Sequence, residues 1–223
     1  RSESALNGTE GKSVRAFVAL PVPSAAITYA LLLQGVFHDQ GIAGRCVRSE
    51  EMHITVEFLG DQVESALDAY GRRLGEIAQW APAPVLGCTG PDTFGRPPSV
   101  VFVGWEDRER RFRQLAEAVR EASREVGLAP PAGQDKRKPV PHLTFLRVKD
   151  PTVQKALRKL QRQTPEGSQW KPFLPPMPSE LRQVALDRMV FMSSTLTPDG
   201  PVYKPLREYR LPAAPGELAI SRP

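Results

Sequence analysis

Two of the three histidines in this 223-residue chain are each followed two positions later by a threonine: His53 by Thr55, and His142 by Thr144. A chance repeat of this kind has a probability of about 0.6%, which is low for so short a motif. Imidazole has an unperturbed pKa of ~6.5, so one ring can accept a proton while another donates one near neutral pH. The repeat therefore indicates paired acid–base chemistry.

Two imidazoles and two hydroxyls that face one cleft suit an in-line displacement at phosphorus. One imidazole activates the attacking oxygen, and the other protonates the leaving oxygen. In a strand each threonine lies about 7 Å from its histidine, at two residues of ~3.3 Å rise, where its hydroxyl can stabilise charge on a phosphate oxygen. A single His-x-Thr is more often a polar pair facing solvent, so the recurrence carries the prediction. The scheme requires no metal.

The residues around each pattern predict a β-strand. In residues 52–59, His53, Thr55 and Glu57 alternate with apolar residues, so we expect these three side chains to share one face. A carboxylate on that face would repel a phosphate, and we assign Glu57 no catalytic role. The residues predicted to lie in the core are Ile54, Phe58, Leu143 and Phe145.

The order of elements repeats along the chain. Apolar periodicity predicts a strand at 15–20, a helix at 24–41, the strand at 52–59 and a helix at 63–78. It predicts the same order again at 100–105, 112–127, 142–148 and 153–160. His53 and His142 are 89 positions apart and Val63 and Val153 are 90 apart, so we infer an internal duplication.

The remaining stretches are connections, shorter strands and tails. We expect short strands at 45–49 and 85–93, one long strand at 181–193, and a hairpin that turns at 197–201 and returns along 202–211. Residues 1–13 and 212–223 lack periodicity and are predicted to be tails around a single domain at 14–211.

Composition bounds the class of protein. The formal charge of +5 favours an anionic partner, and no apolar run approaches the ~20 residues of a membrane-spanning helix. Cys46 and Cys88 form no CxxC or Cys/His cluster, so we expect no zinc site and no disulfide, but buried thiols in a reducing, cytoplasmic compartment. The polar N-terminal stretch lacks the apolar core of a signal peptide.

The chain resembles the 2H phosphoesterase superfamily, in particular the RNA 2′,3′-cyclic phosphodiesterases historically called 2′-5′ RNA ligases. The stretches that carry the resemblance are RAFVALP at 15–21, MHITVEFLG at 52–60, PHLTFLR at 141–147 and LTPDGPVY at 196–203. The resemblance implies an α+β fold of two similar lobes around a central cleft, each an antiparallel sheet with helices on its outer face. It also implies hydrolysis of a terminal 2′,3′-cyclic phosphate on RNA to a 2′-phosphate, a reaction that can run in reverse as 2′-5′ ligation.

The resemblance assigns roles to residues that match the family pattern. It implies that His53 is the proton donor and His142 the acceptor, although a near-symmetric site can exchange these roles. It implies that Thr55, Thr144 and Arg147 bind phosphate. Strand alternation opposes the last assignment, because five residues from His142 is an odd step, and a bulge or the strand end would remove the objection.

Other residues are candidate contacts to RNA. Lys136, Arg137 and Lys138 could follow an RNA backbone, although a solvated loop explains them as well. Tyr203 could stack a base, whereas Trp105 is better interpreted as core. His38 has no following threonine and serves as the control histidine. We expect no cofactor, no metal and no obligate protein partner.

Three functions fit these residues, and RNA cyclic phosphodiesterase fits best. The same site could instead act on small cyclic nucleotides or 2′-5′ oligonucleotides. It could also hold an RNA end without turning it over.

Overall fold

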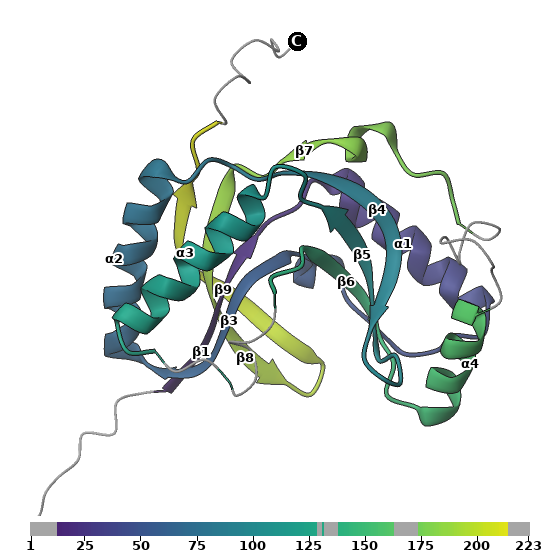
Figure 1. Cartoon of the computed structure of the whole chain (residues 1–223). Coiled ribbons are helices and arrows are strands. Elements are labelled where there is room, and N and C mark those ends of the chain that lie inside the picture. Colours follow the sequence, from purple (N-terminus) through teal and green to yellow (C-terminus); the bar gives the residue numbers. More distant parts are fainter. Residues whose placement is uncertain (1–12, 129–130, 132–137, 163–173, 214–223) are drawn as a thin grey trace, which may run out of the picture.

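The computed structural model describes residues 13–128, 131, 138–162 and 174–213 (Figure 1). Most of the two predicted tails, at 1–13 and 212–223, lies outside these residues. Ser13 already belongs to the first strand, and the carbonyl of Pro212 accepts a 2.9 Å hydrogen bond from the Ala83 N–H.

The described residues form short strands and amphipathic helices close to the predicted ranges. Their order is β1 (Ser13–Leu20), α1 (Ser24–Asp39), β2 (Arg45–Cys46), η1 (Ser49–Glu51), β3 (Ile54–Val63), α2 (Glu64–Trp80), β4 (Val85–Phe94), β5 (Val100–Glu106), α3 (Arg111–Glu125), β6 (His142–Arg147), α4 (Pro151–Arg162), η2 (Ser179–Arg182), β7 (Val184–Ala185), β8 (Arg188–Thr197) and β9 (Gly200–Arg210). The order strand, helix, His-x-Thr strand, helix therefore recurs as β1-α1-β3-α2 and β5-α3-β6-α4.

The strands pair antiparallel in the order β7-β4-β5-β6-β3-β1-β8-β9, with β2 beside β6. Figure 1 shows a strongly curled sheet, with α2 and α3 together at one end and α1 and α4 at the other. The predicted α+β class and the antiparallel pairing are confirmed.

The two sequence halves interlock at the middle of this sheet. β3 meets β6 through the pair Ile54 and Leu143, both fully buried. Helix α1 follows β1 but contacts β6, where the Gln34 side chain donates to the Phe145 carbonyl at 2.8 Å. Helix α3 precedes β6 but contacts β3. Each helix therefore crosses to the strand of the other half and fixes the two His-x-Thr strands relative to one another.

Two strand predictions are wrong, both because the chain changes partner. The predicted strand at 45–49 is reduced to β2, which pairs with β6 and is followed by η1. The predicted strand at 181–193 is divided, because β7 pairs with β4 whereas β8 pairs with β1. The Leu186 N–H donates to the Pro84 carbonyl at 2.9 Å where the chain crosses between them.

The cysteine prediction is partly wrong. Both thiols are free, as expected, and Cys88 is buried, but Cys46 is exposed. Its exposure follows from its place on the two-residue strand β2, both of whose residues face solvent.

Candidate active site

A β-bulge follows Thr55 in β3. Two consecutive residues of β1 pair with Thr55 and Glu57, so Val56 is the extra residue. A bulge shifts the alternation of faces by one residue, which turns Glu57 into the core and brings Phe58 to the face of Thr55. Glu57 is 5% exposed, and Phe58 is only partly buried and lines a pocket. The predictions that Glu57 shares the histidine face and that Phe58 lies in the core are therefore wrong.

A second bulge occupies the equivalent place in β6. Consecutive residues of β5 pair with Thr144 and Leu146, which leaves Phe145 as the extra residue. Leu146 is consequently buried at 2% exposure, and Arg147 is exposed and lines the same pocket as Thr144. The bulge removes the objection that strand alternation raised against Arg147.

Glu57 has a structural environment rather than a catalytic one. The Tyr70 hydroxyl donates to one of its carboxylate oxygens at 2.6 Å, and the Ser123 hydroxyl donates to the other at 2.8 Å. Burial raises the pKa of Glu57, and these two hydrogen bonds oppose that rise. Since Tyr70 belongs to α2 and Ser123 to α3, the carboxylate joins both helices to β3.

The two His-x-Thr patterns lie together in a pocket of about 1100 Å³. β3 and β6 are antiparallel with Ile54 opposite Leu143, so His53 lies beside Thr144 and Thr55 lies beside His142. The lining is basic. Its cationic residues are Arg15, Arg45, Arg96, Arg120, Lys138 and Arg147, against two carboxylates, Glu51 and Glu57. Such a pocket suits an anionic ligand.

Aromatic rings enclose the imidazole of His53. The Phe17 ring stacks on it with centroids 4.8 Å apart and an interplanar angle of 24°, and the Tyr203 ring meets it edge-on at 5.4 Å. The His53 Nε2 lies 3.1 Å from the Thr55 Oγ1, and the backbone carbonyl of Glu51 accepts a hydrogen bond from the ring. The backbone positions of His53 and Thr55 are ~7 Å apart along the strand. Their side chains nevertheless converge.

The surroundings of His53 disfavour its charged form. Burial is the main cause that lowers its pKa, to about 4, and the nearby His142 and Arg147 act in the same direction. The hydrogen bond to the Glu51 carbonyl opposes them. His53 is therefore neutral at pH 7 in the unliganded protein.

His142 has an equivalent environment. Its Nδ1 lies 2.7 Å from the Val140 carbonyl, so Nδ1 carries the hydrogen in the neutral ring and Nε2 has the free electron pair. Phe94 and Phe102 meet the ring edge-on, with centroids 4.9 and 5.3 Å away. Burial lowers the pKa of His142, and Arg147 lowers it further, against the hydrogen bond to Val140. Each imidazole is thus anchored to the carbonyl two residues before it.

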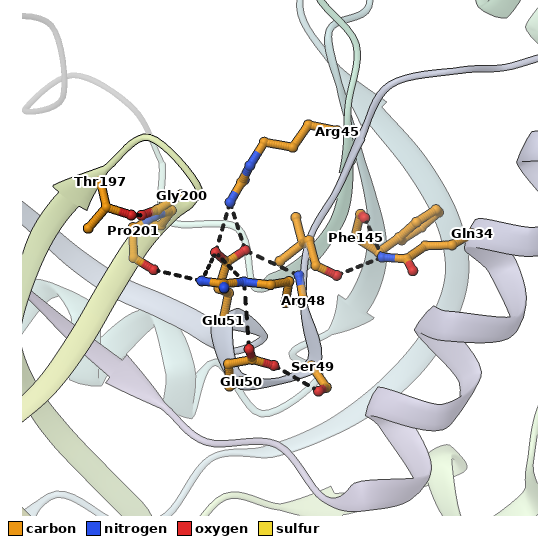
Figure 2. A network of polar contacts seen from close by, with 11 residues as sticks. Gln34, Arg45, Arg48, Ser49, Glu50, Glu51, Phe145, Thr197, Gly200 and Pro201 are labelled. Carbon is orange, nitrogen blue, oxygen red and sulfur yellow. Dashed lines mark hydrogen bonds and ion pairs between the residues drawn. The ribbon is translucent and has the colours of Figure 1, made fainter.

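An ion cluster surrounds the buried carboxylate of Glu51, two residues before His53 (Figure 2). The Glu51 side chain is 2% exposed and accepts bonds from the Arg45 Nη2 at 2.8 Å to both oxygens and from the Arg48 Nη2 at 3.0 Å. The Arg48 Nη2 also donates to the Pro201 carbonyl at 3.3 Å, in the β8–β9 hairpin. The cluster therefore ties the hairpin that carries Tyr203 to the turn that precedes His53.

Gly200 permits this close approach of the hairpin. Its φ of +120° is a conformation that other residues rarely adopt, and a Cβ there would meet the Arg45 Nη2 at 2.6 Å.

The other predicted site residues are only partly brought together. Lys138 and Tyr203 line the pocket, whereas Lys136 and Arg137 lie outside the described residues. The side chain of His38 is 82% exposed, lies 3.7 Å from Asp39 and does not line the pocket. Trp105 is buried in the core, as predicted.

Sequence reasoning named Tyr203 but missed Arg15 and three phenylalanines beside the imidazoles, Phe17, Phe94 and Phe102. Phe17 and Arg15 belong to one face of β1, and the alternation in 15–20 could have indicated them. Phe94 carries no such signal, because it ends β4 and reaches His142 only through the pairing of β4, β5 and β6.

Among the residues that the structure describes, no three His, Cys, Asp or Glu side chains are grouped so as to hold a metal ion. No described helix has the length and apolar character that crossing a membrane requires.

The sequence of the chain is similar to those of known proteins. A model of the 2′-5′ RNA ligase superfamily matches residues 38–172. A Thermotoga maritima protein named RNA 2′,3′-cyclic phosphodiesterase is 27% identical over 197 residues, covering 87% of this chain and 94% of that protein. An Archaeoglobus fulgidus protein of the same name is 31% identical over 174 residues, covering 76% and 85%.

Solved structures show the same fold. The crystal structure of E. coli LigT complexed with 3′-AMP has a TM-score of 0.64 and 21% identity, covering 90% of this chain and 99% of LigT. LigT complexed with NADP+ has a TM-score of 0.66 and 21% identity, covering 91% and 99%.

Proposed function

Because the chain belongs to the 2′-5′ RNA ligase superfamily, we propose that it is a metal-independent RNA 2′,3′-cyclic phosphodiesterase that forms a 2′-phosphate. The observation that carries the proposal is the pair of imidazoles, each fixed by a carbonyl two residues before it, in one basic pocket. Relatives that carry this name support the substrate class.

In the proposed reaction a water molecule attacks the phosphorus and the bond from phosphorus to O3′ breaks. The Nε2 of His142 takes the proton of the attacking water, and His53 gives a proton to O3′. The products are a terminal 2′-phosphate and a free 3′-hydroxyl. The 2.7 Å contact between the His142 Nδ1 and the Val140 carbonyl supports the acceptor role, because it leaves Nε2 with its electron pair.

The donor role of His53 requires that substrate binding raise its pKa. The unliganded pKa of about 4 leaves the ring neutral at pH 7. A phosphate held beside the ring is a negative charge in a shielded pocket, which favours the imidazolium form. We therefore infer that the substrate and the proton bind together. In the reverse, ligating direction the two histidines exchange roles.

Thr55, Thr144 and Arg147 are proposed to bind the phosphate oxygens. All three line the pocket, and the bulge at Phe145 brings Arg147 to the face of Thr144. The antiparallel pairing of Ile54 with Leu143 supports a two-fold arrangement of two similar lobes around the phosphate. We propose the single domain to be 14–211, with Lys136, Arg137, Lys138 and Tyr203 as further contacts to RNA and with a cytoplasmic location.

An end-group assay tests the function. An oligonucleotide with a terminal 2′,3′-cyclic phosphate is incubated with the protein in EDTA, and the product end is identified by mass and by phosphatase sensitivity. We expect turnover to a 2′-phosphate. Tight binding without turnover would indicate an RNA-end-binding module, and turnover of mononucleotides alone would indicate an enzyme for small cyclic nucleotides.

A further inference from the structure

Arg15 is held in a defined place in the pocket. Its guanidinium carbon lies 4.6 Å from the centre of the Phe58 ring, and its Nη1 lies 3.5 Å from the Asp61 Oδ2. The side chain is 32% exposed and that of Asp61 67%, so the ion pair is weak and can yield to a phosphate. The contact with the ring orders the guanidinium before a ligand arrives.

The internal duplication relates this arrangement to Arg147. Phe58 and Arg147 are each the third residue after the threonine of a His-x-Thr pattern, and each comes to the pocket face through a bulge. On β6 that position supplies a cation directly. On β3 it supplies an aromatic ring on which the cation of Arg15 rests. Both sides of the pocket therefore present a guanidinium at equivalent places.

The two guanidinium groups extend the site in opposite directions. Because β3 and β6 are antiparallel, Phe58 and Arg147 follow their threonines toward opposite ends of the central strands. The bulge leaves Phe58 about two strand steps, or ~7 Å, beyond Thr55. Arg15, over the Phe58 ring, therefore lies toward the end of the site away from Arg147, displaced along the strand by a step of the order of one nucleotide. The volume of about 1100 Å³ leaves room for more than one nucleotide, since pockets for drug-sized ligands hold about 300–1,000 Å³.

We propose that Arg15, ordered by the Phe58 ring, forms a second phosphate subsite that binds the phosphodiester joining the terminal nucleotide to its neighbour. The inference rests on the proposed function and adds to it a preference for oligonucleotides over mononucleotides. The ligand of the subsite is the internal phosphodiester of an RNA strand, and its binding contributes to KM rather than to the chemical step.

The test compares Arg15→Gln with Arg108→Gln, a variant that loses the same charge from an exposed ion pair with Glu106 that does not line the pocket. The substrates are a nucleoside 2′,3′-cyclic phosphate and a dinucleotide with the same end. For R15Q we expect KM for the dinucleotide to rise about tenfold to a hundredfold, the worth of one charge-assisted hydrogen bond. The kcat of R15Q for the dinucleotide, and its kcat and KM for the mononucleotide, should match those of R108Q. The salt dependence of dinucleotide KM should weaken by one phosphate contact, a slope change of about 0.7.

Two results would overturn the subsite. If R15Q loses activity equally on both substrates, Arg15 contacts the reacting phosphate instead. If R15Q and R108Q have equal kcat and KM values for both substrates, Arg15 does not bind the substrate. If R15Q melts at a lower temperature, Phe58→Leu removes the ring and should give the same selective loss.

If the wild-type protein turns over neither substrate, the proposed function fails, and the subsite is tested by binding alone. The probes are then a fluorescent dinucleotide and a mononucleotide, each with a terminal 3′-phosphate. A selective loss of dinucleotide affinity in R15Q supports the subsite, and unchanged affinity refutes it.

Discussion

Glu57 lines the pocket, and replacing its buried carboxylate tests whether the residue is structural or catalytic. It lies four residues from His53 in sequence and at the back of the pocket, yet its contacts are to the Tyr70 and Ser123 hydroxyls. Replacing it by alanine removes both hydrogen bonds. The Ser123 hydroxyl can still donate to the Arg120 carbonyl at 2.8 Å, whereas the Tyr70 hydroxyl keeps only a 3.5 Å contact with the Val119 carbonyl. A hydrogen bond to a charged group contributes ~1.5–3 kcal/mol, so we expect Glu57→Ala to lower the free energy of unfolding by about 1.5–3 kcal/mol, chiefly through Tyr70.

Glu57→Gln is the matched variant. The amide oxygen can accept from one hydroxyl and the amide N–H can donate to the other, so the loss should stay below ~1 kcal/mol. The pH dependence has a definite sign. Burial raises the pKa of Glu57 in the folded state, so its stabilising contribution is complete below the unfolded pKa and is lost as pH rises through the folded pKa. Relative to the wild type, E57Q should therefore gain stability as pH rises.

Urea unfolding measures these free energies, and initial rates at a temperature where each variant is folded measure catalysis. We expect kcat to stay within about threefold of the wild type in both variants, because no imidazole contacts the carboxylate. A hundredfold fall in kcat for E57Q with unchanged stability would refute the reasoning, since a positioned acid–base group supplies ~10²–10⁴-fold. It would show that Glu57 orients an imidazole.

Two further predictions concern the histidines. His53→Ala and His142→Ala should each lower kcat by ~10²–10⁴-fold in the end-group assay. His38→Ala is the control and should leave kcat unchanged. Equal losses of kcat in all three variants would exclude the paired-imidazole site. In urea unfolding, the free energy should fall between pH 7.5 and 5 by about 2 kcal/mol more in the wild type than in His53→Gln, because an unfolded histidine protonates below ~6.5 and the folded His53 only near 4. Equal falls would show that the ring is solvated.

The side chains proposed to be catalytic are predictable from the sequence because their signal is local. His53 and Thr55 follow strand alternation, and so does the burial of Ile54 between them. The recurrence at His142 then predicts the pairing of two strands around one cleft. Helix α2 is equally local, since Leu67, Leu74 and Ile77 are buried at helical spacing.

The parts that the sequence does not predict depend on partners far along the chain. The bulge at Val56 exists only as a mismatch with β1, so alternation in β3 alone assigns Glu57 and Phe58 to the wrong faces. The ion cluster joins Arg48 to Pro201, 153 residues apart. Arg147 is the converse case. The family pattern indicated that it binds phosphate, whereas strand alternation placed it on the opposite face from His142. The bulge at Phe145 removes this conflict.

His53 and His142 have similar surroundings, so the proposed reaction requires a reason why one of the two imidazoles becomes the acid. Both rings are anchored through a carbonyl and both have lowered pKa values, so the unliganded pocket favours two bases and no acid. Arg147 contributes to this, because its charge lowers the pKa of both rings. A phosphate bound to Arg147 would cancel that charge and place its own negative charge beside the imidazoles, so one ring can then take up a proton. We infer that Arg147 couples phosphate binding to protonation, and that the pocket gains its acid only when the substrate is present.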